Sequence, residues 1–120
     1  MALDAYSQVV SSVAAELTPK VAAVRVRRQG SGSAVVFTGD GFLLTNAHVV
    51  GRARSGTLAF SDGGSAEFTV VGADPLSDLA VIRAHGATPE PARLGDSDGL
   101  VVGQLVVAVG NPLGLAGSVT

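Results

Sequence analysis

The stretch S-A-V-V-F-T-G-D-G-F-L-L-T at residues 33–45 decides the fold class. Apolar and β-branched residues at 33–37 predict one strand, and those at 42–45 predict a second. Between them, residues 38–41 (T-G-D-G) have the composition of a tight turn, with glycine available where the backbone needs a positive φ. Residues 33–45 are therefore expected to form an antiparallel β-hairpin.

The same pattern continues on both sides of this hairpin. Before it, Val24 and Val26 alternate with Arg25 and Arg27, and Gly30-Ser31-Gly32 is expected to turn the chain. After it, strands are predicted at 57–60, 66–71, 79–83 and 105–109, with a turn at 61–64 and loops at 74–77 and 110–112. Strands that recur every eight to twelve residues or so, without helices between them, are typical of an antiparallel barrel or sandwich.

Residues 1–18 have a different period and predict an amphipathic helix. Asp4 is a candidate N-cap, and Pro19 should end the helix near Thr18. The apolar residues of one helical face are Tyr6, Val9, Val10, Val13, Ala14 and Leu17. Such a face requires a partner. Packing on the helix's own domain is the favoured expectation, and contact with another subunit is the alternative.

Composition excludes several functions. Apolar residues make up 47% of the 120-residue chain and charged residues 15%, which suits a single domain with a packed core. The net charge of −2 provides no basic field, so nucleic acid is not an expected partner. Without cysteine, the chain offers no disulfide, thiol nucleophile or zinc-thiolate site.

The sequence shows no targeting signal. Residues 1–18 contain Asp4 and Glu16 and lack a basic start followed by an unbroken apolar stretch, so a signal peptide is not expected. No run of about 18 apolar residues could span a bilayer. These features leave the compartment unknown.

Two weak motifs argue against a cofactor or a metal. Gly30-Ser31-Gly32-Ser33 lacks the third glycine and the Lys-Ser/Thr pair of a phosphate-binding loop. His48 and His85 lie far apart in the sequence, without further ligands at metal-binding spacing. We therefore expect neither a cofactor nor a metal.

His48 and Asp78 are the candidates for chemistry. His48 lies where an apolar strand ends, and Asp78 directly precedes another apolar strand. A carboxylate buried there would cost several kcal/mol unless a donor such as an imidazole N–H met it. Taken alone, each residue is more often structural, His48 as a hydrogen-bonding group and Asp78 as a turn or strand-edge residue.

Five sequence blocks in a specific order change that balance. They are G-S-G-S-A-V-V (30–36), L-L-T-N-A-H-V-V (43–50), D-P-L-S-D-L-A-V-I (74–82), L-G-D-S-D (94–98) and V-G-Q to G-N-P-L-G (102–114). From about residue 30 to 120 the chain resembles the HtrA/DegP group of trypsin-like serine proteases. The resemblance implies the double-barrel chymotrypsin fold, with His48 as general base and Asp78 as the carboxylate that orients it.

The resemblance also implies a domain organisation. Residues 1–18 would be the N-terminal amphipathic helix, and residues 19–92 the first barrel, all-β, antiparallel and six-stranded. Residues 93–120 would be the inter-barrel connection and the first strand of an incomplete second barrel. Because that strand is apolar on both faces, residues 104–120 could support self-association.

The nucleophile is the point of departure from the family. Family members carry it in a G-N-S-G-G-P segment downstream of the G-N-P-x-G block, and residues 1–120 contain no such segment. Ser97, in G-D-S-D-G, is rejected because Asp98 replaces a glycine that the oxyanion hole requires and no proline follows. The chain is thus expected to be inactive alone.

Three functional interpretations remain. The first is the N-terminal part of an HtrA-like endopeptidase whose complete form hydrolyses unfolded or misfolded proteins, in a family usually found in the bacterial envelope or secreted. The second is a non-catalytic β-barrel for binding or scaffolding. The third is a half-enzyme that needs a second chain.

Overall fold

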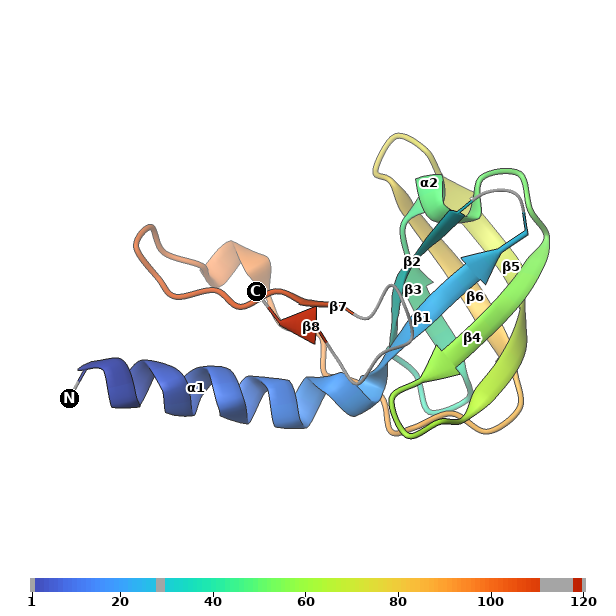
Figure 1. The fold of residues 1–120 in the computed structure, drawn as a ribbon. Helices are drawn as coiled ribbons and strands as arrows, with labels where there is room; N and C mark the ends of the chain where they lie inside the picture. Colours follow the sequence, from blue (N-terminus) through green and yellow to red (C-terminus); the bar gives the residue numbers. More distant parts are fainter. Residues whose placement is uncertain (1, 28–29, 111–117, 120) are drawn as a thin grey trace.

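The computed structural model describes residues 2–27, 30–110 and 118–119, and its main body is a closed antiparallel β-barrel (Figure 1). The strands are β1 (Val21–Val26), β2 (Gly30–Val36), β3 (Phe42–Thr45), β4 (Ser55–Phe60), β5 (Ser65–Asp74) and β6 (Leu79–His85). Neighbours follow the order β1-β2-β3-β6-β5-β4, and the pairing of β1 with β4 closes the barrel. The predicted fold class, a six-stranded antiparallel barrel after one N-terminal helix, is confirmed.

The hairpin predicted at residues 33–45 is formed by β2 and β3. The Phe37 N–H donates to the Phe42 carbonyl at 3.1 Å, and the Phe42 N–H donates to Thr38 Oγ1 at 3.0 Å. Gly41 has a φ of +94°, the left-handed geometry for which the turn needed a glycine. The sequence pattern was therefore sufficient to locate this hairpin.

The turn expected at residues 30–32 is wrong. β2 begins at Gly30, which pairs with Val26, and Gly32 pairs with Val24. Gly32 serves a close approach instead, since a Cβ atom at this position would lie 2.6 Å from Cγ2 of Val49. Packing against Val49, and not chain reversal, explains the glycine at position 32.

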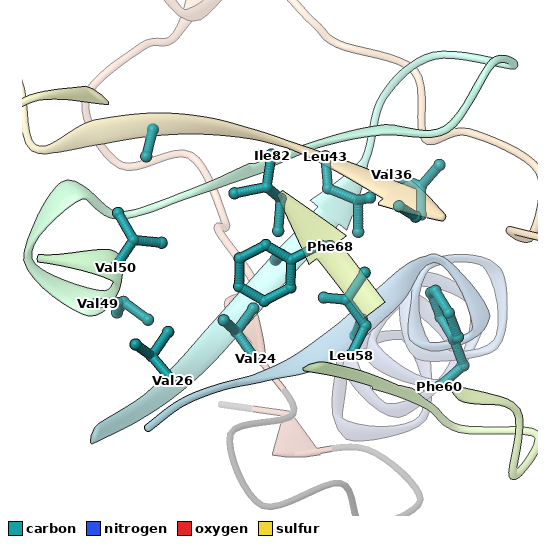
Figure 2. Close-up of a cluster of buried hydrophobic side chains, with 14 residues drawn as sticks. Val24, Val26, Val36, Leu43, Val49, Val50, Leu58, Phe60, Phe68 and Ile82 are labelled. Atoms are coloured by element: carbon teal, nitrogen blue, oxygen red, sulfur yellow. The ribbon is translucent and has the colours of Figure 1, made fainter. Parts of the chain in front are cut away.

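Inward-facing side chains of the strands fill the barrel around Phe68, whose ring lies at the centre of the cluster in Figure 2. The largest fully buried side chains are Phe68, Leu43, Leu58, Ile82, Val24, Val36 and Val50. Val50 belongs to the short helix α2 (Ala47–Val50), which the sequence pattern did not predict. With Val49 and Val50 buried, α2 covers one end of the barrel (Figure 1).

The N-terminal helix is confirmed as α1 (Ala2–Leu17), followed by a 3-10 turn at Thr18–Lys20. Asp4 lies within the first helical turn and is therefore not the N-cap. Figure 1 shows that α1 projects away from the barrel, so the favoured expectation of packing on its own domain is wrong. Tyr6 and Val9 on its apolar face are exposed accordingly.

The described residues after the barrel contain little regular structure. The Ala92 N–H donates to the Val36 carbonyl at 2.7 Å and ties this connection to β2. The strand predicted at 105–109 is wrong in extent, since β7 covers Val109–Gly110 and pairs with β8 (Ser118–Val119). Val106 is 76% exposed, and an apolar segment forms a strand only where a neighbour pairs its backbone. Asn111 and Pro112 of the loop predicted at 110–112 lie outside the described residues.

Candidate active site

His48 is held at one end of the barrel by α2. Helix α2 follows β3 after one residue, Asn46, which is its N-cap with extended backbone dihedrals of −91° and 142°. Val49 and Val50 anchor the helix in the core, while the His48 side chain points outward and is 71% exposed. The sequence therefore fixes α2 through its valines and leaves the imidazole accessible.

Asp78 is delivered by the loop between β5 and β6. Asp74 shapes this loop, because its carboxylate accepts hydrogen bonds from the Leu76 N–H at 3.1 Å and the Ser77 hydroxyl at 3.0 Å. Asp78 then adopts a φ of +58°, the one positive value for a non-glycine residue in the part of the chain that the structure describes. This backbone reversal lets β6 begin at Leu79 with the carboxylate turned toward α2.

The Asp78 carboxylate binds His48 through both of its oxygens. Oδ2 lies 2.7 Å from Nδ1 of the imidazole, and Oδ1 accepts the backbone N–H of His48 at 2.9 Å. The two residues are thirty positions apart in the sequence. Together, the side-chain contact and the backbone contact fix His48 relative to the carboxylate. The family resemblance of the two segments implied that these residues meet.

These bonds set the protonation of the pair. Two hydrogen bonds from His48 hold the pKa of the Asp78 carboxyl below its usual range. The bond from the backbone N–H has the larger effect, and the bond from the imidazole has the next largest. The carboxylate is therefore ionised at neutral pH. An ionised carboxylate accepts but does not donate, so the hydrogen between the two groups resides on Nδ1. With that hydrogen on Nδ1, Nε2 is the ring nitrogen that can accept a proton when the imidazole is neutral.

The carboxylate is not buried, contrary to expectation. The Asp78 side chain is 44% exposed although it contacts His48 of α2. Its ionisation is therefore favoured by water as well as by His48, and burial does not force the pairing.

A pocket of about 340 Å³ opens beside the pair. Its lining consists of Ala47, His48, Gly51, Arg52, Ala73, Pro75 and Asp78. The guanidinium of Arg52 brings a permanent positive charge to this lining. The lining therefore combines an imidazole, a carboxylate and an arginine with mostly small side chains.

Sequence comparison with known proteins places this geometry in a family. The profile of the trypsin-like peptidase domain matches residues 32–120. Serine protease PepD of Mycobacterium tuberculosis is 44% identical over an alignment of 124 positions, gaps included, which covers 92% of this chain and 27% of PepD. The chain belongs to the HtrA-type, trypsin-like serine proteases.

Two further relatives extend the similarity. The putative serine protease HhoB of Synechocystis is 40% identical over 78% of this chain, and a probable periplasmic DegP-like serine endoprotease of Ectopseudomonas mendocina is 42% identical over 77%. The chain spans 27%, 23% and 19% of the lengths of PepD, HhoB and the DegP-like protein.

The other serine and histidine considered in this HtrA-type chain lie elsewhere. Ser97 begins a 3-10 turn (Ser97–Gly99) that Figure 1 places outside the barrel, away from α2. The Asp96 side chain accepts the Asp98 N–H at 3.0 Å and shapes that turn. His85 hydrogen-bonds Thr69 Oγ1 at 3.0 Å on the barrel surface.

The described residues contain neither a cluster of metal ligands nor a helix that could span a membrane. Within residues 2–27, 30–110 and 118–119, no three His, Cys, Asp or Glu side chains gather as metal ligands would. In the same part of the chain, no helix has the length and apolarity needed to cross a membrane.

Sequence reasoning missed the contact made by Asn46. Its side-chain amide donates to the Asp78 carbonyl at 3.2 Å, and the Ala47 N–H donates to the same oxygen at 3.1 Å. The asparagine stands in the T-N-A-H-V-V block that carried the family resemblance, so its position beside His48 was the available signal.

Proposed function

We propose that His48 is the general base and Asp78 the orienting carboxylate of a serine endopeptidase. The contact of 2.7 Å between His48 Nδ1 and Asp78 Oδ2 carries this proposal. Nε2 would take the proton of a serine hydroxyl as its oxygen attacks the peptide carbonyl, and would return that proton to the leaving amine. Asp78 keeps the tautomer and stabilises the imidazolium without becoming protonated.

The nucleophile and the oxyanion donors would come from another stretch of polypeptide. Residues 1–120 contain no G-x-S-G-G segment, and such a segment carries both groups in this family. Residues 93–120 would then connect the first barrel to a second one. We accordingly propose that residues 1–120 alone have no peptidase activity, since a base without a nucleophile cannot form an acyl-enzyme.

Casein hydrolysis by purified residues 1–120 tests this proposal. No hydrolysis is expected, and hydrolysis that His48→Ala abolishes would contradict it. If the coding sequence beyond Thr120 contains G-N-S-G-G-P, the corresponding protein should hydrolyse casein and lose that activity with His48→Ala or Asp78→Asn. An active protein in which His48→Ala has no effect would remove His48 from the mechanism.

Two other functions are outcomes of a second experiment. A second-barrel segment is added to residues 1–120, and a fluorophosphonate probe reports an activated serine. Labelling that requires both pieces identifies a half-enzyme. No labelling in any combination identifies a non-catalytic binding or scaffolding barrel.

The proposal extends to a compartment and to substrates. Relatives named periplasmic endoproteases favour a bacterial envelope location for this protein as well. The family resemblance favours unfolded or misfolded proteins as the substrates of the complete protein. The exposed apolar side chains at Leu105 and Val106 favour self-association through residues 104–120 when nothing else covers them.

A further inference from the structure

We propose that Asn46 is a positioning residue: with the Ala47 N–H, its side-chain amide holds the Asp78 carbonyl and so keeps the Asp78 carboxylate on His48. The proposal deepens the function proposed above and rests on it for its catalytic meaning. Its structural content, that Asn46 controls the conformation of Asp78, stands on the contacts of the two residues.

The hydrogen bond that an N-cap side chain usually accepts is made by Asp78 and not by Asn46. An asparagine at a helix N-cap ordinarily accepts the N–H of the second or third helical residue through its side-chain oxygen. Asn46 makes no such bond, and the N–H of the second residue, His48, goes to Asp78 Oδ1. Asp78 therefore caps α2, and the Asn46 amide is turned toward the Asp78 backbone, where it donates at 3.2 Å.

Asn46 holds Asp78 in an uncommon backbone conformation. With a φ of +58°, Asp78 occupies a region that residues with a side chain adopt infrequently, although aspartate enters it more readily than most. Two donors on its carbonyl, at 3.2 Å and 3.1 Å, stabilise that conformation from the α2 side. Rotation of Asp78 to a negative φ would break both bonds and swing the carboxylate away from the imidazole.

Few charged or titratable groups lie near Asp78, so the titration of its carboxyl can report its geometry. His48 and Arg52 share its pocket from the α2 side, and Asp74 belongs to its own loop. None of these side chains is altered when Asn46 is replaced. A change in the titration of Asp78 would therefore report a change in its geometry.

NMR of the isotope-labelled chain, residues 1–120, tests the proposal with Asn46→Leu, which removes the donor at similar size. The pKa of the Asp78 carboxyl should rise toward the ordinary aspartate value. The intense amide-to-Hα NOE that a positive φ produces within Asp78 should weaken. In an active protein that contains this chain, kcat should fall roughly 10- to 100-fold with little change in KM.

Asp62→Ala is the matched control. It removes a side-chain bond to the Gly64 N–H, 2.8 Å long, in the β4–β5 turn. It should lower the melting temperature and leave Asp78 unchanged. If Asn46 were merely structural, Asn46→Leu would behave like this control, and an unaltered Asp78 pKa and NOE would overturn the proposal.

If Asn46→Leu fails to fold, a second measurement on the wild-type chain still tests the proposal. In the wild-type chain, the heteronuclear NOE of the Asn46 side-chain nitrogen should match that of ordered backbone, and a freely rotating amide would overturn the proposal. None of these NMR readouts requires peptidase activity. An inactive protein with the expected spectra would therefore refute the proposed function alone.

Discussion

Replacing Gly32 with alanine should damage the barrel and the His48–Asp78 pair together. The new Cβ would lie 2.6 Å from Cγ2 and 3.2 Å from Cγ1 of Val49, well inside the ~3.5–4.0 Å at which carbon atoms pack. Val49 is 6% exposed and β-branched, so it has no free rotamer into which its methyl groups can move. Helix α2 must shift instead, and His48 shifts with it.

The size of the effect follows from two opposing terms. Overpacking a core costs about 1–3 kcal/mol, whereas replacing glycine with alanine at a compatible backbone conformation gains ~0.4–1 kcal/mol through the unfolded state. The net destabilisation of Gly32→Ala should centre on about 1.3 kcal/mol. Gly72→Ala is the control, because a Cβ at Gly72 meets no atom within 4 Å. The two substitutions should therefore differ in sign.

A double-mutant cycle with Val49→Ala identifies the cause. Val49→Ala alone should cost roughly 1.5–3 kcal/mol for the lost methyl groups and the cavity. Because it also removes the clash, the double variant should be more stable than the sum of the single effects by about 1–3 kcal/mol. Urea unfolding followed by far-UV circular dichroism suits the chain, which has no tryptophan. Additivity to within about 0.5 kcal/mol would refute the steric argument.

Three shorter predictions concern the pair, the core and the exposed segment. The pKa of Asp78 is lowered in the folded state, so its contribution to the free energy of unfolding is present at neutral pH and is lost as the pH falls below ~4. In urea titrations at acid pH, the difference in stability between wild type and Asp78→Asn should therefore shrink. Phe68→Ala should lower the free energy of unfolding by about 3–5 kcal/mol, because the ring is fully buried, and a smaller loss by calorimetry would mean that the core collapses around the gap. Val106→Lys should reduce self-association in sedimentation velocity, and an unchanged association constant would exclude this segment as the contact.

The turns and strands were predictable where one local rule decides the structure. Gly41 and Gly63 have positive φ values, and both lie in turns that glycine and aspartate had marked in the sequence. Helix α2 was not predictable in this way, because four residues are too few for a helical period and Val49-Val50 looks like the continuation of an apolar strand. The wrong prediction of a turn at Gly32 has a similar origin. The close approach of Val49, which explains the glycine, exists only in the folded barrel.

The members of the candidate site and their contact were predictable, but the backbone geometry that joins them was not. His48 and Asp78 came from a family resemblance, because no local rule joins residues thirty positions apart. The positive φ of Asp78 had no decisive signal in the sequence, since aspartate enters this region more readily than most residues but far more often has a negative φ. The apolar face of α1 indicates that a partner is needed, but its pattern cannot identify that partner.

The His48–Asp78 pair is assembled from backbone that the first barrel supplies by itself. Valines in the core fix α2, the Asp74 turn and the start of β6 fix Asp78, and hydrogen bonds join the two without any group from outside the described residues. An imidazole held in this way has its tautomer set before a nucleophile approaches, so a serine that arrives needs to be positioned against one nitrogen only. The orientation of the proposed base, His48, is thus a property of this barrel's folding, and it should persist in residues 1–120 even where peptidase activity does not.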